Sequence, residues 1–224
     1  MASLLVLVPT DGERRVLAPA IASTLDAVAR VELCGFGPVA AAARTAALVA
    51  RHTPDRVVLV GIAGRLDERL AIGSAHAFRE VACFGIGAGS GASFEPAAAL
   101  GWPQWPGDPV GVEAGIGDVI DCGPAGAAAS SAAGLLVTAC AASASEAEVA
   151  DRRRLFPAAV AEDMEGYGVA LACRLAGVPL RIVRGISNDA GDRDKRRWRI
   201  TDALEAAAAL AGTILASAGR EPSP

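Results

Sequence analysis

The amino-acid sequence predicts an α/β domain around a mainly parallel sheet, and three observations support this fold class. Short runs rich in β-branched residues or leucine alternate with longer alanine-rich stretches of helical character, a pattern typical of α/β proteins. Glycine-rich turns follow several of the strand-like runs. A length of 224 residues suits one domain with a single sizeable core. We therefore expect residues 1–224 to form one domain, without repeats or a linker.

The first part of the chain predicts three strands separated by two helices. Glycines and a proline close the second strand, and the turn Gly61–Gly64 closes the third. In order, the predicted elements are the strand Leu4–Val8, the helix Glu13–Ala29, the strand Val31–Phe36, the helix Val39–Arg51 and the strand Arg56–Val60. Because ligands of α/β proteins bind beyond the carboxyl ends of strands, we expect functional residues at these strand-end turns.

The rest of the chain continues this alternation after an irregular middle section. Residues 85–109 are rich in glycine and proline and predict a long loop. Their segment Gly85–Gly91 lacks the sixth-position glycine of a dinucleotide-binding turn, so we interpret it as a flexible loop. The remaining predicted strands are Ser74–Ala82, Gly134–Ala139, Ala158–Ala161 and Leu180–Ile186, and the remaining predicted helices are Ser145–Leu155, Glu165–Ala176 and Thr201–Ser217.

Composition and charge narrow the class of protein. Hydrophobic residues make up 52% of the chain but aromatic residues only 4%, so we expect helices to pack closely through alanine and glycine. The formal net charge of −4 gives no global reason to expect nucleic acid as a partner. One basic run, Arg193–Arg199, is either a solvated loop or helix face or a contact for an anionic group on a ligand.

Cysteine usage and hydropathy indicate a cytoplasmic protein. The five cysteines lie far apart and form no CxxC pair, so neither a disulfide framework nor a zinc site is expected. We expect no metal and no cofactor. The start of the chain lacks the basic region of a signal peptide. The uncharged span Gly123–Ser145 consists mostly of alanine, glycine and serine, which partition weakly into a bilayer, so we expect no membrane segment.

Two polar motifs lie at the ends of predicted strands. The first, Ala161-Glu162-Asp163-Met164-Glu165-Gly166, places carboxylates at the start of an otherwise apolar helix, and the second, Arg184-Gly185-Ile186-Ser187-Asn188, ends the next strand. Asp163 and Glu165 suit a helix N-terminus on local grounds alone, as a cap and as a charge near the helix dipole. They equally suit the floor of a pocket, and the residues by themselves favour neither interpretation.

These motifs, with Gly61-Ile62-Ala63-Gly64 after a strand and Glu13 after the first strand, resemble the nucleoside phosphorylase and nucleosidase superfamily. Within it, the chain is most similar to the futalosine hydrolases, in order and over essentially its whole length. The resemblance implies a three-layer αβα sandwich with a central mixed, mostly parallel sheet. It also implies hydrolysis of futalosine to hypoxanthine and dehypoxanthine futalosine, a step of menaquinone biosynthesis.

The resemblance further implies a role for each matching residue. N-glycosidic cleavage passes through an oxocarbenium-like sugar, so the site must hold the sugar, stabilise positive charge and activate a water. Glu165 resembles the carboxylate that accepts hydrogen bonds from the ribose hydroxyls, and Met164 the residue that packs on the ribose. Glu13 matches the water-activating base, and Arg184 a residue that holds this water. The other substrate-binding residues implied are Ile62, Ala63, Gly64 and Asp163. Without the resemblance, Glu13 would read as a solvated first-turn glutamate.

Asn188 distinguishes among members of the superfamily. In the adenine-specific nucleosidases an Asp occupies the matching position. A carboxamide offers both a donor and an acceptor, so it can donate to a 6-oxo group while its oxygen accepts from a protonated N7. This pairing favours hypoxanthine over adenine. As alternatives, Asn188 is a helix cap or turn residue, or Asp189 or Asp192 is the active acid.

The chain also departs from the pattern of its relatives. Ile62 replaces a serine that positions water in the adenine-specific nucleosidases, and Arg65 replaces a glycine of the turn. The segment Ala141–Ser145 lacks the aromatic ring that often stacks on the base. Phe156 and Tyr167 are the substitutes that the sequence offers, although both residues also suit the core or an interface.

Several functions compete with futalosine hydrolysis. A purine nucleoside phosphorylase needs arginines near the first helix to bind phosphate, but Arg14 and Arg15 are adjacent and point in different directions on a helix. Another nucleosidase, such as a methylthioadenosine/S-adenosylhomocysteine nucleosidase, or a non-enzymatic nucleoside sensor are further alternatives. In every case the expected ligand is a purine nucleoside, and the superfamily suggests a homo-oligomer.

Overall fold

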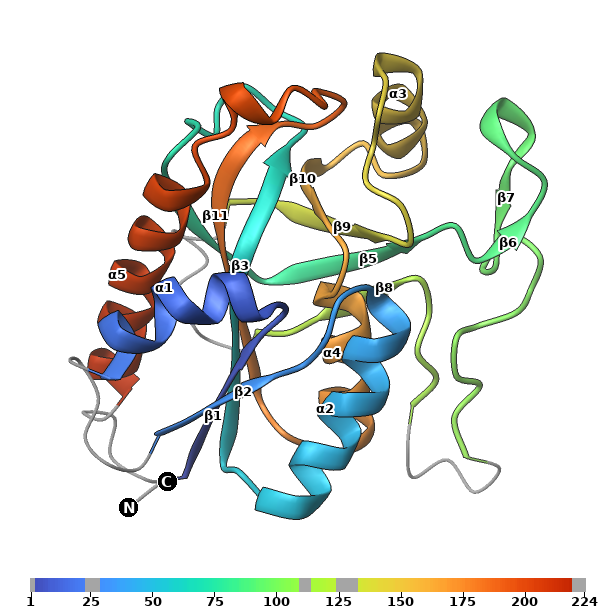
Figure 1. The fold of residues 1–224 in the computed structure, drawn as a ribbon. Coiled ribbons are helices and arrows are strands. Elements are labelled where there is room, and N and C mark those ends of the chain that lie inside the picture. Colours follow the sequence, from blue (N-terminus) through green and yellow to red (C-terminus); the bar gives the residue numbers. More distant parts are fainter. Residues whose placement is uncertain (1–2, 23–28, 109–113, 124–132, 219–224) are drawn as a thin grey trace.

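A central sheet enclosed by helices forms the body of the protein (Figure 1). The computed structural model describes residues 3–22, 29–108, 114–123 and 133–218. Within these ranges, nine strands form one sheet, and a further two short strands pair separately. The architecture is the αβα sandwich with a mixed, mostly parallel sheet that the sequence and its resemblance predict.

The sheet is mainly parallel, with three antiparallel pairs. Its strand order is β2 (Ala29–Leu33), β1 (Leu4–Val8), β3 (Arg56–Arg65), β10 (Ala159–Asp163), β9 (Leu135–Ala139), β5 (Glu80–Phe84) and β8 (Val119–Asp121), with β11 (Leu180–Asp189) beside β3 and β4 (Ala75–Phe78) beside β11. The antiparallel pairs are β10 with β3, β4 with β11 and β8 with β5.

Strand β3 brings the ends of several strands together. One of its edges pairs with β11 from Val57 to Arg65. On the other edge its first residues pair with β1, and Gly64 and Arg65 pair with β10. Because β10 is antiparallel to β3, its last residue, Asp163, points back toward the middle of β3. The carboxyl ends of β1, β3, β10 and β11 therefore converge.

Helices cover both faces of this sheet (Figure 1). Helices α1 (Asp11–Ala22) and α5 (Ile200–Ala218) pack on one face, and α2 (Pro38–His52) and α4 (Gly166–Leu175) pack on the other. Side chains of a strand alternate between faces: Val58 and Val60 pack with the first pair of helices, whereas Val57 and Leu59 pack with the second. Burial on both faces explains why these strands are continuously apolar.

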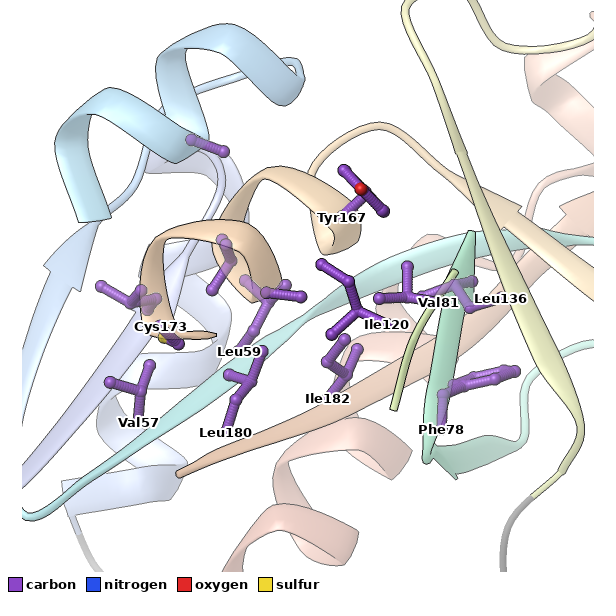
Figure 2. Close-up of a cluster of buried hydrophobic side chains, with 14 of the residues drawn as sticks. Val57, Leu59, Phe78, Val81, Ile120, Leu136, Tyr167, Cys173, Leu180 and Ile182 are labelled. Atoms are coloured by element: carbon purple, nitrogen blue, oxygen red, sulfur yellow. The ribbon is translucent and has the colours of Figure 1, made fainter. Parts of the chain in front are cut away.

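Figure 2 shows the core on the α4 side of the sheet. Val57, Leu59 and Leu180 from β3 and β11 lie near Cys173 of α4, and Ile182 of β11 lies below Ile120. All these side chains are buried. The helix that follows the acidic motif is thus anchored on the sheet, which holds its N-terminus in place.

Glycine permits the close packing of helices that the composition predicts. A Cβ atom on Gly168 of α4 would lie 2.3 Å from the carbonyl oxygen of Pro38 at the start of α2, and one on Gly185 of β11 would lie 2.0 Å from that of Ala203 in α5. Neither position accommodates a side chain. α2 and α5 therefore approach their neighbours closely through glycine.

Strands β2, β3 and β11 differ from the prediction by two or more residues at an end, and β9 and β10 differ by one or two. β3 and β11 continue to Arg65 and Asp189, so Gly61–Gly64 lies inside a strand instead of forming a turn. The two strands extend because each satisfies the backbone of the other, and this pairing outweighs the weak strand propensity of glycine. β2 begins at Ala29 and ends at Leu33, before the segment in which Gly35 and Gly37 adopt positive φ.

The predicted helix Glu13–Ala29 was also wrong at both ends. α1 begins at Asp11 and is described to Ala22, whereas residues 23–28 lie outside the described ranges. Ala29 begins β2 and pairs with Leu4 of β1. Alanine favours a helix locally, but the sheet supplies hydrogen-bond partners that a local pattern cannot reveal.

In the middle of the chain, one predicted strand is two. The strand predicted at Ser74–Ala82 divides at Arg79 into β4, which pairs with β11, and β5, which pairs with β8 and β9. The short strand β8 was not predicted. Residues 85–108 are mainly loop, as expected, with paired strands β6 (Gly87–Ala88) and β7 (Glu95–Pro96).

The other predicted helices are present with small shifts. α2, α4 and α5 lie within a residue or two of their predicted positions, and so does α3 (Glu146–Leu155). Ser145 caps α3 by accepting a hydrogen bond from the backbone N–H of Glu148. Residues 124–132 of the span Gly123–Ser145 lie outside the described ranges. Among the described helices, none has the length and apolar character needed to cross a membrane.

Candidate active site

A cavity of about 550 Å³ opens where the ends of β1, β3, β10 and β11 converge. This is the position expected for a ligand site in an α/β fold. The predicted site residues that line it are Glu13, Ile62, Ala63, Gly64, Asp163, Met164, Glu165 and Asn188. Arg184 does not line the cavity but is buried against its acidic residues.

Glu13 is held by two elements on one side of the cavity. It lies in the first turn of α1 and is buried rather than solvated. Its Oε2 accepts hydrogen bonds from the backbone N–H of Thr10 at 3.1 Å and from the Thr10 hydroxyl at 2.6 Å. Its Oε1 accepts from the backbone N–H of Ile62 in β3 at 3.1 Å. These bonds connect α1 to β3 and fix the direction of the carboxylate.

Arg184 is the largest fully buried side chain of the described residues. Its Nε and Nη2 donate to Oδ2 of Asp163 at 3.0 and 2.7 Å, and Nη2 also lies 3.3 Å from Oε2 of Glu165. Its Nη1 has no hydrogen-bond acceptor within the described part of the protein. Burial opposes the charged form, but the neighbouring carboxylates outweigh it and raise the pKa of Arg184.

Gly61 makes room for Arg184 and Glu13 to approach each other. A Cβ atom on Gly61 would lie 2.2 Å from Nη1 of Arg184 and 2.8 Å from Oε1 of Glu13. The unsatisfied donor and the carboxylate oxygen thus flank the same small space. A single polar group, such as a water, can interact with both. The glycine that the sequence suggested as a turn residue serves instead to clear this space.

Asp163 has its carboxylate fully engaged by the protein. Oδ1 accepts from the Thr138 hydroxyl at 2.6 Å, and Oδ2 accepts from the backbone N–H of Gly166 at 3.0 Å and from Arg184. The bond to Gly166 satisfies a free N–H at the start of α4. Asp163 therefore has both roles that the sequence suggested. It accepts from a backbone N–H at the start of α4, and it belongs to the site because it positions Arg184.

Glu165 lies at the N-terminus of α4 and faces the cavity. Its Oε1 accepts from the backbone N–H of Gly37 at 3.1 Å. Burial raises the pKa of Glu165 to about 7, and Asp163 and Glu13 act in the same direction, while Arg184 and the Gly37 N–H oppose them. Asp163 and Glu165 share the guanidinium of Arg184, so Glu165 is the carboxylate of this cluster that takes up a proton near neutral pH.

Asn188 lines the cavity and is oriented by two contacts with its neighbours in β11. Its Nδ2 lies 2.7 Å from the carbonyl oxygen of Asp189, which can only accept, and its Oδ1 accepts from the Ser187 hydroxyl at 2.7 Å. These partners fix the positions of the amide oxygen and nitrogen of Asn188. One N–H and one lone pair remain for a ligand. Asn188 is thus not a helix cap, because it lies inside β11.

Two aromatic side chains line the cavity, and the sequence analysis missed both. Phe36 is 66% exposed on the segment between β2 and α2, and Trp198 follows β11. Phe156 instead packs against a core cluster, and Tyr167 is buried with its hydroxyl donating to the carbonyl of Gly117. The signal for Phe36 was its position between two glycines, whose positive φ angles turn the chain out of the strand.

A third feature of the site was also missed. Ser143 and Glu162 line the cavity, and Glu162 accepts hydrogen bonds from the Ser143 backbone N–H at 2.8 Å and hydroxyl at 2.6 Å. Arg152 lies 3.5 Å from Glu162 and donates to the carbonyl of Ala141 at 3.0 Å. The segment Ala141–Ser145 lacks an aromatic ring, but these hydrogen bonds fix its backbone beside the cavity.

Other candidate groups lie elsewhere. Arg14 and Arg15 both pair with Asp11, at 2.7 and 2.8 Å, and neither lines the cavity. Asp192 and Asp189 do not line it either, so the structure brings neither alternative acid to the site. Over the residues that are described, no group of three or more His, Cys, Asp or Glu side chains could hold a metal ion.

The fold and this site define a class of protein. The sequence profile of the Phosphorylase superfamily matches residues 19–218, and the chain belongs to that superfamily. Futalosine hydrolase of Streptomyces coelicolor is 33% identical over 192 residues, covering 80% of this chain and 75% of that protein. The 5′-methylthioadenosine/S-adenosylhomocysteine nucleosidase of a Shewanella species is 30% identical over 169 residues, covering 70% of this chain and 67% of that protein.

A solved structure has the same fold. The futalosine hydrolase of Helicobacter pylori superimposes with a TM-score of 0.74 at 15% sequence identity, over 96% of this chain and 98% of that one. At this identity the likeness concerns the fold. The predicted resemblance to the superfamily and to the futalosine hydrolases is confirmed.

Proposed function

We propose that this protein hydrolyses the N-glycosidic bond of futalosine, releasing hypoxanthine and dehypoxanthine futalosine in menaquinone biosynthesis. The observation that carries the proposal is the buried pair of Glu13 and Arg184 flanking Gly61, with Asn188 presenting a free donor and acceptor in the same cavity. The similarity to the futalosine hydrolase of Streptomyces coelicolor supports the choice of substrate.

The charge of the site suits the transition state of this reaction. Departure of the base leaves positive charge on the sugar. Glu13, Asp163 and Glu165 face a single guanidinium, so the ionised cluster has an excess of negative charge. Fixed carboxylates in a buried site stabilise developing positive charge strongly. Glu165 accepts from the ribose hydroxyls in this mechanism, and Met164 packs on the ribose.

Water activation falls to Glu13 in this mechanism. Its Oε1 and the unsatisfied Nη1 of Arg184 flank one space, where a water would donate a proton to the carboxylate and accept a hydrogen bond from the guanidinium. Deprotonation as the water attacks the sugar is general-base catalysis. The leaving base takes a proton at N7 from solvent water, and Asn188 binds it, because its amide donates to O6 and accepts from the protonated N7.

A substrate panel tests the proposed function. Futalosine, inosine, methylthioadenosine and aminodeoxyfutalosine are incubated with the enzyme, each with and without inorganic phosphate. We expect phosphate-independent release of hypoxanthine from futalosine, faster than turnover of the other three. No hypoxanthine release from futalosine contradicts the proposal, and a strict requirement for phosphate would indicate a phosphorylase.

The runner-up is a methylthioadenosine/S-adenosylhomocysteine nucleosidase, favoured by the Shewanella relative. Two residues favour futalosine instead. Ile62 replaces the serine that positions water in the adenine-specific enzymes, and Asn188 replaces their Asp. For Asn188 the local contacts support a neutral amide, since its Nδ2 lies 2.7 Å from the carbonyl oxygen of Asp189.

Substitution of Asn188 by Asp is expected to change the base preference. Asn188→Asp loses the donor to O6 and places a second acceptor beside the Asp189 carbonyl, so futalosine turnover should fall at least about 100-fold, as for a site with an unpaired buried group. The ratio of methylthioadenosine to futalosine kcat/KM should rise. Steady-state kinetics of both substrates measure this ratio, with Asp189→Asn as the matched control outside the cavity. An unchanged ratio would contradict the role of Asn188.

The activity should depend on the ionisation of Glu165. Because its pKa is raised to about 7 and the ionised form is both the stronger acceptor for the ribose hydroxyls and the form whose charge stabilises the cationic sugar, kcat/KM should rise with pH up to about 7 and then level off. Glu165→Gln, which does not titrate, should lose this rise together with most of the activity. A pH profile of kcat/KM for futalosine on both proteins checks this, and a rise that persists in Glu165→Gln would assign it to another group.

Assembly and location complete the proposal. We propose a homo-oligomer, because Phe36 and Val39 expose apolar side chains beside the cavity, at 66% and 78%. The free cysteines of the described residues fit the reducing cytoplasm. A purine nucleoside is the proposed ligand, and neither nucleic acid nor a membrane is a proposed partner.

A further inference from the structure

The basic run Arg193–Arg199 follows β11 and divides into two groups. Three of its five basic residues have an acidic partner close by in the chain. The pairs are Arg196 with Asp194 at 2.8 Å, Arg197 with Asp192 at 3.4 Å, and Arg199 with Asp202 at 2.6 Å. Charge neutralisation within the loop thus accounts for these three cations, as for an ordinary solvated segment.

Arg193 and Lys195 form the second group. Neither makes an ion pair with any residue of the described ranges, and both line the cavity. Both are exposed to solvent. The two cations of the run that have no acidic partner are therefore the two that face the ligand site. A solvated surface run gives no reason for this division.

Trp198 orders this part of the cavity wall. Its indole N–H donates to the carbonyl of Asp192 at 3.1 Å, and the guanidinium of Arg193 lies 5.3 Å from the centre of its ring. This distance is within the range of a cation–π contact. Trp198 also lines the cavity, so an aromatic face and a cation are presented to the ligand side by side.

The distribution of charge inside the cavity indicates where an anionic group of a ligand would lie. Glu13 and Glu165 occupy the buried side and repel a carboxylate, whereas Arg193 and Lys195 lie at the exposed loop and attract one. A ligand whose sugar reaches Glu165 can be anionic only in a part that extends toward this loop. Charge-assisted hydrogen bonds from arginine and lysine suit such a carboxylate.

We propose that Arg193, Lys195 and Trp198 form a subsite for an aryl carboxylate joined to the ribose side of the nucleoside. The two cations bind the carboxylate and the indole contacts the apolar part of the tail. This inference rests on the proposed function, because the tail of futalosine is an aromatic carboxylate. It deepens that function by naming the residues that select a charged tail.

The test compares futalosine with its tail methyl ester, which keeps the base, ribose and ring but removes the charge. Arg193→Gln, Lys195→Gln and the double variant are assayed beside Arg196→Gln, a matched control in the same run that does not line the cavity. We expect the double variant to raise KM for futalosine about five- to tenfold, as for two partly solvated charge contacts, with kcat within twofold. KM for the ester and all constants of Arg196→Gln should stay unchanged.

The outcomes separate this inference from the proposed function. If wild type cleaves futalosine but the double variant prefers it over the ester as strongly as wild type does, the subsite is overturned and the function stands. Phosphate-stimulated turnover that the double variant loses would assign the cations to free phosphate and also overturn it. If wild type does not cleave futalosine, the proposed function fails, and the subsite is tested by comparing S-adenosylhomocysteine with methylthioadenosine as substrates. A smaller preference for the carboxylated tail in the double variant than in wild type supports the subsite. An unchanged preference, or no turnover of either substrate, overturns the subsite.

Discussion

Replacement of Glu13 by glutamine should reduce kcat for futalosine by about 10²- to 10⁴-fold, the usual contribution of a general base. The amide has nearly the same shape but cannot take a proton from water. KM should change little, because the ribose is held by Glu165 and the base by Asn188. Steady-state hypoxanthine release and direct titration of futalosine measure the two effects separately.

The effect on folding should be small by comparison. The carboxylate of Glu13 accepts from Thr10 and from Ile62, and an amide nitrogen in place of either oxygen loses an acceptor, at a cost of about 1 kcal/mol. Urea unfolding of the variant checks this. Glu32→Gln, in β2 and outside the cavity, is the matched control and should keep full activity. A kcat within threefold of wild type for Glu13→Gln would contradict its role as base.

Replacement of Arg184 by methionine should produce the largest loss of stability, about 3–5 kcal/mol of the free energy of unfolding, as for breaking a buried ion pair. Methionine fills similar space but leaves Asp163 and Glu165 without their counter-ion in a fully buried site. For a protein of ordinary stability, about 5–15 kcal/mol, this is a large fraction. Urea denaturation followed by circular dichroism measures it.

The loss should also depend on pH. Burial raises the folded-state pKa of Glu165 to about 7, above the ordinary value of 4.5 for a glutamate, so its contribution to stability is present at low pH and is lost as pH rises through 7. Removing the guanidinium raises the folded-state pKa further, so Arg184→Met should be more destabilised at pH 8 than at pH 6. Asp163→Asn in the same background should recover part of the loss.

Arg196→Met is the matched control for this substitution. Its side chain is 90% exposed, and its partner Asp194 is also at the surface, so the unfolding midpoint should not move. Equal destabilisation of Arg184→Met at pH 6 and 8 would show that packing, and not charge, explains the role of Arg184. A loss smaller than that of an ordinary surface substitution would contradict the buried network altogether.

The parts of the fold that the sequence predicted correctly are those with a strong local pattern. The strand Leu4–Val8 has the predicted limits, because its continuous apolar run can only be buried on both faces of a sheet. Helices α2 and α5 also lie close to their predictions. Where a segment is stabilised by a distant strand, as in Gly61–Gly64 within β3, local reasoning failed.

The site shows the same division. Its acidic motif, Arg184 and Asn188 could be named from the sequence and its resemblance to known families, and the structure places them around one cavity with Glu13 from the other end of the chain. Their roles stay predictions. The two aromatic residues that line the cavity, Phe36 and Trp198, could not be predicted from the sequence. They reach the cavity through loops whose course depends on the packed sheet.

Local patterning is thus sufficient to identify the α/β class, because this class depends on composition and on order along the chain. The family and the residue types of the chemistry came from the resemblance of the motifs to known proteins. Local patterning cannot supply contacts between residues far apart in sequence. The proximity of Glu13 to Arg184 across Gly61, the engagement of Asp163 by Thr138, and the separation of paired from unpaired cations in the Arg193–Arg199 run arise only when the strands assemble. Burial and long-range hydrogen bonding set these distances, and neither is encoded in any short segment.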